Sequence, residues 1–436
     1  MTQSDQLAPG AMRRVALASM VGTTIEFYDF FIYGTAAALV FNRVFFPAMG
    51  AASGTALALA TFGVAFVARP FGSILFGHYG DRLGRKGTLV TTLLTMGIST
   101  LLIGLLPSSA AIGVAAPIIL VLLRILQGLA VGGEWAGAVL LTAENAPTRS
   151  RGKFALWPQL GPSIAFALAS ATFLITTLTM SSESFLAWGW RVPFIASVIL
   201  VGVGLYVRLK LTETTVFTSI EHTKNRLPIA EALTSRPRAV LLGALSTTTA
   251  FAFFYIGVTY LTTYGTTELK LSRPTVLALG IAGGAAMMIT TIISANLADR
   301  IGRRRVVTLG TAAAVVAGII AFPIIDIGAA WSFGVGLCLV LGVVGLAYGA
   351  QGSLLPELFP TRYRYTGAGI SYNLAGVLGG GVVPLIAAAV VPTYGSLALG
   401  IILTVVAAIG LGCTLALPNT NAESFAEQDK LAAASR

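Results

Sequence analysis

Twelve long apolar runs, separated by short stretches that hold most of the charges, follow one another along the chain. They lie near residues 15–40, 56–78, 88–106, 114–142, 154–178 and 188–209, and then near 239–264, 276–298, 306–326, 331–355, 367–391 and 394–416. A helix of about 20 residues crosses the hydrocarbon core of a bilayer, and a run of roughly 18 apolar residues is the usual sign of one. The pattern predicts an all-α integral membrane protein with twelve transmembrane helices.

The composition agrees with this pattern and excludes other classes of protein. Of the 436 residues, 56% are hydrophobic and only 10% are charged, whereas a soluble domain carries about 25% charge. Twelve spans take up about 240 residues, which leaves no room for a nucleotide-binding fold, and no G-x-x-x-x-G-K-[ST] loop occurs. Cys338 and Cys413 lie in apolar runs without ligand-like neighbours, so we expect neither a metal nor a cofactor.

The basic residues are distributed unevenly between the two sides of the predicted membrane. The net charge of +11 would suggest nucleic acid in a soluble protein. However, 22 of the 28 Lys and Arg residues fall on the side of the N-terminus, and only Arg43, Arg191, Lys270 and Arg273 fall on the other. Cytoplasmic loops carry this excess. We therefore predict cytoplasmic termini, anionic lipid as a partner at that face, and no nucleic acid.

Two pairs of polar loops indicate an internal repeat. Asp81-Arg82-Leu83-Gly84-Arg85-Lys86 matches Asp299-Arg300-Ile301-Gly302-Arg303-Arg304, and Pro147-Thr148-Arg149 matches Pro360-Thr361-Arg362, with Glu144 and Glu357 three residues ahead. Such repeats build two bundles that face each other across a cavity. The predicted domains are a cytoplasmic tail (1–14), a six-helix bundle (15–209), a cytoplasmic linker (210–238), a second six-helix bundle (239–416) and a cytoplasmic tail (417–436).

Three charged side chains fall near the middle of predicted spans. An ionisable group there costs about 2.5–3.5 kcal/mol, so it is a functional candidate. Glu26 and Asp29 share one helix face, and because two neighbouring carboxylates do not both ionise easily, we expect the pair to bind a proton. Arg124 stays protonated and needs an anionic partner. These three residues are our candidates for proton coupling, and a fixed structural ion pair is the alternative. Arg69, nearer the inner side, would snorkel to the interface.

A further group of polar and amphipathic side chains lies at membrane depth and is able to hydrogen-bond a small polar substrate. Each of them is equally able to make a helix–helix hydrogen bond. The candidate substrate ligands are Tyr33, Gln127, Trp135, Trp157, Gln159, Tyr255, Tyr260, Tyr348, Gln351, Tyr372 and Asn373.

The repeated loops suggest a latch at the cytoplasmic side. Asp81 and Asp299 can accept hydrogen bonds from a helix N-terminus or pair with nearby arginines. The predicted cytoplasmic gate comprises Asp81, Arg82, Arg85, Glu144, Arg149, Asp299, Arg300, Arg303, Glu357 and Arg362. In the alternative interpretation, the arginines only set the topology and bind lipid.

These loops resemble the signature loop of the major facilitator superfamily, and Arg124-Ile125-Leu126-Gln127-Gly128 resembles its R-x-x-Q-G motif, whose arginine is associated with proton transfer. More narrowly, residues 25–34 (IEFYDFFIYG), 132–135 (GGEW) and 188–194 (WGWRVPF) resemble the metabolite:proton symporter family. The resemblance implies the major facilitator fold and uptake of shikimate, α-ketoglutarate, citrate, proline or betaine. Span five keeps Gly161-Pro162 without the flanking glycines of the drug antiporters, which argues against efflux.

Together, these features predict a secondary active transporter and not an enzyme. It would import a small organic acid or zwitterion by proton symport through alternating access, as a monomer in the inner or plasma membrane. The first alternative is a proton-coupled exporter or antiporter, and the second is a membrane channel or receptor. The sequence leaves open which metabolite is carried and whether the coupling ion is a proton or sodium.

Overall fold

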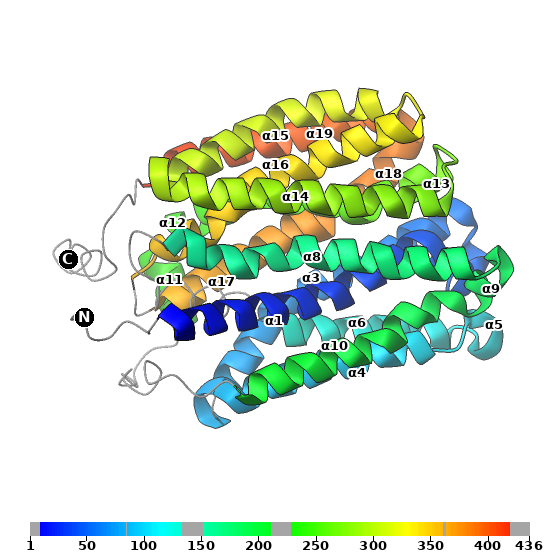
Figure 1. Cartoon of the computed structure of the whole chain (residues 1–436), viewed down its shortest axis with the longest axis horizontal. Helices are drawn as coiled ribbons and strands as arrows, with labels where there is room; N and C mark the ends of the chain where they lie inside the picture. The colour runs from blue at the N-terminus through cyan, green and yellow to red at the C-terminus, as the bar shows by residue number, and fades with distance from the viewer. Residues whose placement is uncertain (1–8, 84, 133–150, 211–227, 361–362, 419–436) are drawn as a thin grey trace.

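The computed structural model describes residues 9–83, 85–132, 151–210, 228–360 and 363–418. Within them the chain is helical, with no strand (Figure 1). The first half holds α1 (Pro9–Ala36) continued by η2 (Ala37–Phe41), α2 (Asn42–Val44), η3 (Pro47–Met49), α3 (Ala51–Leu83), α4 (Arg85–Leu105), α5 (Ser109–Ile112), α6 (Ala115–Val131), α8 (Arg151–Thr179), α9 (Ser182–Ala187), η5 (Gly189–Arg191) and α10 (Val192–Lys210).

The second half begins with the short helix α11 (Pro228–Ser235), inside the predicted linker. It continues with α12 (Pro237–Tyr255), η7 (Ile256–Tyr260) and α13 (Leu261–Thr267), then α14 (Arg273–Ile301), α15 (Arg303–Ile325), α16 (Ala330–Glu357), α17 (Arg364–Ala375), η9 (Gly376–Val382), α18 (Val383–Tyr394) and α19 (Ser396–Ala416).

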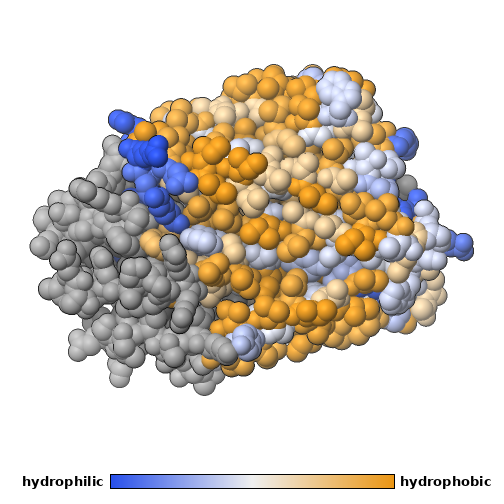
Figure 2. All heavy atoms as spheres, viewed as in Figure 1, coloured by the Kyte–Doolittle hydropathy of each residue, from blue (hydrophilic) through white to orange (hydrophobic). Residues whose placement is uncertain are grey.

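The described helices are long and apolar enough to cross a membrane. Ten of them qualify by length and hydropathy, and Val90–Leu105 and Ala115–Val131 are shorter apolar helices. Large side chains such as Ile118, Ile199 and Ile319 are exposed on the outer surface. Figure 2 shows hydrophobic residues over the middle of the visible face and hydrophilic ones towards its two ends. The twelve apolar helices confirm the predicted fold class.

In the described part of the chain, three spans contain a π-helical segment that the apolar pattern did not reveal. These segments are η2, η7 and η9, and they interrupt the spans that begin with α1, α12 and α17. A π-helical turn widens the helix locally and is frequent at functional sites. The first and seventh spans occupy equivalent places in the two halves of the chain, so the repeat extends to this irregularity.

The two bundles meet along the length of the molecule. Figure 1 shows α8 beside α14, and both α1 and α19 have their chain ends at the same end of the molecule, here called the terminal end. Towards the opposite end, a Cβ atom added to Gly34 would lie 3.0 Å from Oγ1 of Thr259, and one added to Gly63 would lie 3.5 Å from the Gly381 carbonyl oxygen. Close approaches of this kind need small residues.

Candidate functional site

A chain of hydrogen bonds inside the first bundle joins a buried arginine to a buried carboxylate. Nη1 of Arg124 donates to Oε1 of Gln127 at 2.8 Å, Nε2 of Gln127 donates to Oγ1 of Thr100 at 2.7 Å, and Thr100 donates to Oδ2 of Asp29 at 3.0 Å. Oγ1 of Thr100 also lies 2.9 Å from the Met96 carbonyl oxygen, so its one proton serves either acceptor. When that proton points to Asp29, Gln127 and Thr100 connect Arg124 to the carboxylate without direct contact.

The predicted attraction between Arg124 and the carboxylates of span one stays a prediction, since Gln127 and Thr100 lie between Arg124 and Asp29. Among the described residues, Arg124 forms no ion pair with a carboxylate. Its Nη2 donates to the Phe62 carbonyl at 3.2 Å, and its guanidinium lies 3.9 Å from the centre of the Tyr33 ring and 4.5 Å from that of Phe30. Cation–π contacts of this kind contribute about 2 kcal/mol when they are desolvated.

Asp29 is almost completely buried and only partly hydrogen-bonded. Its Oδ1 has no partner in the described part of the chain. Ser197 of α10 lies nearby, but its hydroxyl donates to the Phe194 carbonyl at 2.8 Å. An ionised carboxylate buried in this way costs several kcal/mol unless it is paired. The position therefore suits a group that gains and loses a proton.

Arg69 does not snorkel, and that expectation was wrong. The side chain is 2% exposed, and its guanidinium lies against the rings of Phe30 and Phe66, at 4.6 and 4.7 Å from their centres. The aromatic faces replace water around its charge. Arg69, Arg124 and the buried Glu26 all lie within electrostatic reach of Tyr255 in the second bundle.

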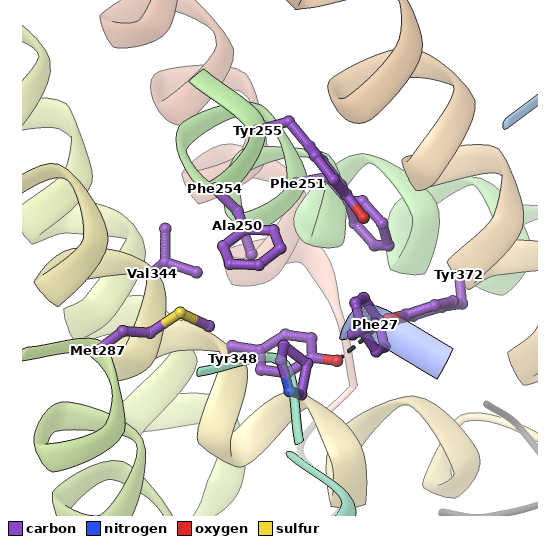
Figure 3. Close-up of a pocket in the computed structure, with 10 residues that line it drawn as sticks. Phe27, Ala250, Phe251, Phe254, Tyr255, Met287, Val344, Tyr348 and Tyr372 are labelled. Carbon is purple, nitrogen blue, oxygen red and sulfur yellow. Dashed lines mark hydrogen bonds between the residues drawn. The ribbon is translucent and has the colours of Figure 1, made fainter. Parts of the chain in front are cut away.

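An aromatic cavity lies between the bundles, next to this charged region (Figure 3). Its volume is only about 10 Å³. The hydroxyls of Tyr348 and Tyr372 meet at 3.0 Å on its wall. The lining residues are Phe27, Pro162, Ala250, Phe251, Phe254, Tyr255, Met287, Val344, Tyr348 and Tyr372. In this conformation the cavity is nearly filled by its own side chains.

Tyr255, Tyr348 and Tyr372 are thus the predicted substrate ligands that line this cavity. Gln351, one turn beyond Tyr348, is 1% exposed, and neither of its amide atoms has a partner among the described residues. Tyr33 donates to Thr61 at 2.6 Å, and Gln127 belongs to the hydrogen-bond chain.

Other predicted ligands connect helices or lie away from the cavity. Gln159 of α8 donates to the Tyr348 carbonyl at 2.7 Å, and Asn373 of α17 donates to the Gly132 carbonyl at 2.9 Å, so both join the two bundles. Trp157 is half-buried in the second turn of α8, and Tyr260 stacks on Tyr264 in the seventh span.

The terminal end brings together three of the predicted gate residues. Nη1 of Arg303 lies 2.5 Å from Oε1 of Glu357, and its Nη2 lies 3.9 Å from Oδ1 of Asp299. Oδ2 of Asp299 accepts from the Lys153 backbone N–H at 3.2 Å, in the first turn of α8. Asp299 thus lies at a helix N-terminus of the other bundle, the arrangement predicted for it. Arg300, which follows Asp299 in the sequence, is exposed.

Several predicted residues lie outside the described part of the structure. They are Trp135, Glu144, Arg149 and Arg362, together with the side chains of Asp81, Arg82 and Arg85.

Sequence reasoning missed Thr100 and the apolar lining of the cavity. A threonine in an apolar run carries no signal of its own, because most such hydroxyls bond to the preceding turn, as Thr247 does to the Gly243 carbonyl at 2.8 Å. Phe27 and Phe251 look like ordinary lipid-facing residues in the sequence. Only the packing of helices from both bundles reveals their common cavity.

No group of three or more metal-ligating side chains occurs among the described residues. The site therefore consists of hydrogen-bonding, charged and aromatic side chains. Such a set is able to bind and orient a polar solute and to hold a proton.

Comparison with known proteins agrees with this architecture. The inner membrane metabolite transport protein YhjE of Escherichia coli (strain K12) is 44% identical over 419 residues, covering 94% of this chain and 95% of that protein. The shikimate transporter of the same strain is 40% identical over 403 residues, covering 90% and 91%.

Among solved structures, the proton:xylose symporter XylE bound to 6-bromo-6-deoxy-D-glucose superposes with a TM-score of 0.77 at 16% identity, covering 97% of this chain and 99% of that one. Residues 19–384 match the Major Facilitator Superfamily over most of the chain, as the loop motifs predicted. The chain belongs to the Major Facilitator Superfamily of multi-pass membrane transporters.

Proposed function

We propose that this protein imports a small organic acid or zwitterion together with a proton, by alternating access. The observation that carries the proposal is the buried Asp29 at the end of the Arg124–Gln127–Thr100 hydrogen-bond chain. Relatives named as metabolite and shikimate transporters, at 44% and 40% identity, support the substrate class.

Asp29 is the proposed proton-binding group. When it is protonated, the buried region loses one negative charge and the field of Arg69 and Arg124 is less compensated. The region then attracts an anionic group of the substrate more strongly. When the substrate is released, the arginines lose its negative charge. The ionised form of Asp29 then becomes favourable again, so the proton leaves Asp29. Proton and substrate binding thus favour each other, as symport requires.

The two bundles contribute different parts of the proposed substrate site. Tyr255 lines the cavity and also lies within electrostatic reach of Arg69 and Arg124, so a substrate carboxylate would lie on that side. The hydroxyls of Tyr348 and Tyr372 would hydrogen-bond its remaining polar groups, together with the Gln351 amide, which has no partner in the described part of the chain. Binding at the interface of the bundles couples the substrate to their relative motion.

The terminal end is the proposed cytoplasmic gate. Asp299 bonds across the interface to the N-terminus of α8, and Asn373 bonds across it to Gly132. Opening towards this end breaks both contacts, while the Arg303–Glu357 pair remains inside the second bundle. The excess of basic residues on this side supports cytoplasmic termini in the inner or plasma membrane, and the site needs residues of one chain only, which supports a monomer.

Uptake into proteoliposomes tests this proposal. Labelled shikimate, α-ketoglutarate, citrate, proline and betaine are offered with an inward proton gradient, with no gradient, and with the gradient collapsed by an uncoupler. Import by symport predicts saturable accumulation of at least one compound only with the gradient. Efflux of the compound driven by the inward proton gradient would identify an exporter. Unitary conductance in planar bilayers would identify a channel.

A further inference from the structure

A second cavity lies at the opposite end of the first bundle, far from the aromatic cavity in the fold. Its volume is about 300 Å³. It is therefore roomier than the central cavity in this conformation. Its lining residues are Arg43, Val44, Pro47, Ser108, Ala110, Leu186, Ala187 and Arg191. No acidic side chain is among them.

Arg191 is held in a fixed orientation at this cavity. Its Nη1 donates to the Ala187 carbonyl at 3.1 Å, its Nη2 donates to the Leu106 carbonyl at 2.9 Å, and its guanidinium lies 4.3 Å from the centre of the Trp190 ring. Trp190 is fully buried and packs against Phe41. A guanidinium has five N–H donors, so three remain for a ligand. Such a pre-oriented cation loses little entropy when it binds an anion.

The acidic residues at this end, Glu183, Glu268 and Asp326, do not line the cavity. Among the described residues, neither Arg43 nor Arg191 forms an ion pair with a carboxylate. Arg43 also lies within electrostatic reach of a third arginine, Arg273, so like charges gather here. Glu183, in the first turn of the adjacent α9, is exposed and does not line the cavity.

The structure assigns an anion-binding site to this cavity, with Arg43 and Arg191 as its two guanidinium ligands for a phosphate or carboxylate group. Guanidiniums match the geometry of both groups, and a space of about 300–1,000 Å³ suits a small molecule or a headgroup. The anion comes either from a phospholipid headgroup at this face of the membrane or from a dissolved organic or inorganic anion. The site is separate from the central cavity and does not depend on the transported substrate.

Binding measurements on the purified full-length protein test this site. The two probes are dihexanoylphosphatidylglycerol, for a lipid source, and inorganic phosphate, for a dissolved source, each titrated at constant ionic strength. The test variant is Arg43→Gln, because Arg43 is exposed and makes no described hydrogen bond that the fold needs. The matched control is Lys270→Gln, which removes one exposed positive charge at the same end without touching the cavity.

At least one probe is expected to bind the wild-type protein and the Lys270→Gln variant equally, and the Arg43→Gln variant about tenfold more weakly, equal to about 1.4 kcal/mol. Binding of the lipid alone identifies a headgroup site, and binding of phosphate identifies a site for dissolved anions. Absence of binding by either probe, or an equal loss in the Arg43→Gln and Lys270→Gln variants, would overturn the assignment.

Discussion

Replacing Asp29 by Asn separates proton coupling from substrate binding. The amide has the shape of the carboxylic acid, and its oxygen can still accept the Thr100 hydroxyl that lies 3.0 Å from Oδ2. The NH₂ group takes the place of Oδ1, which already lacks a partner among the described residues. Leaving that group unsatisfied costs about 1–3 kcal/mol, which a folded protein tolerates. The variant is therefore expected to fold and to bind substrate but not to carry a proton.

The loss of substrate accumulation expected from Asp29→Asn follows from the size of the proton gradient. One proton moved down a gradient of one pH unit supplies about 1.4 kcal/mol, which is a tenfold accumulation of substrate. Two pH units therefore give about 100-fold accumulation in the wild-type protein at zero membrane potential. The variant is expected to equilibrate its substrate, with a ratio of about one, and to retain counterflow exchange.

The assay follows a labelled substrate in proteoliposomes with the membrane potential clamped. The control is Asp326→Asn, the same chemical change at the opposite end, where Asp326 accepts from Tyr264 at 2.7 Å and from Ser396. Asp326→Asn should keep gradient-driven accumulation. If Asp29→Asn still accumulated its substrate to the wild-type ratio, Asp29 would not be the coupling group.

Three further changes test other parts of the structure. Thr100→Val leaves buried polar atoms of Gln127 and Asp29 without partners, at about 1–3 kcal/mol each, so gradient-driven uptake should fall at least tenfold, and Thr100→Ser should restore it. Glu357→Gln breaks the buried ion pair with Arg303, which costs about 3–5 kcal/mol. The melting temperature of this variant in detergent should fall by more than that of a variant with both Arg303 and Glu357 replaced by Met. A larger fall in the double variant would contradict the ion pair. Gly128→Ala puts a Cβ atom into the Ala65 carbonyl oxygen, whereas a Cβ atom on Gly202 meets nothing within 4 Å. Overpacking costs about 1–3 kcal/mol, so the first should lower the melting temperature and Gly202→Ala should not.

The apolar pattern predicted the helices well because a bilayer imposes a length on every span. The predicted run at 394–416 corresponds to α19 (Ser396–Ala416), and the run at 276–298 lies within α14 (Arg273–Ile301). The π-helical segments were not predictable in this way. They depend on packing between spans, and a run such as GVLGGGV in η9 has the composition of any closely packed membrane helix.

The charged part of the site was easier to predict than the cavity. Asp29 and Arg124 stand out because ionisable groups are costly within a membrane, and the structure places them in one hydrogen-bond chain. Thr100, which connects them, and the aromatic side chains beside them cost little free energy to bury. Such residues are common in membrane helices, so the sequence does not distinguish them. Arg69 shows the limit of reasoning from one helix, since its burial depends on rings from a neighbouring span as well as its own.

The proton flux that accompanies substrate entry tests the central claim most directly. Wild-type protein in lightly buffered proteoliposomes, with the membrane potential clamped and no sodium present, receives a transported substrate outside while a pH electrode follows the medium. Symport predicts alkalinisation of the medium, with about one proton taken up for each labelled substrate molecule, and no alkalinisation above the empty-vesicle control with Asp29→Asn. Substrate entry without a pH change, or entry that requires sodium, would contradict proton coupling at Asp29.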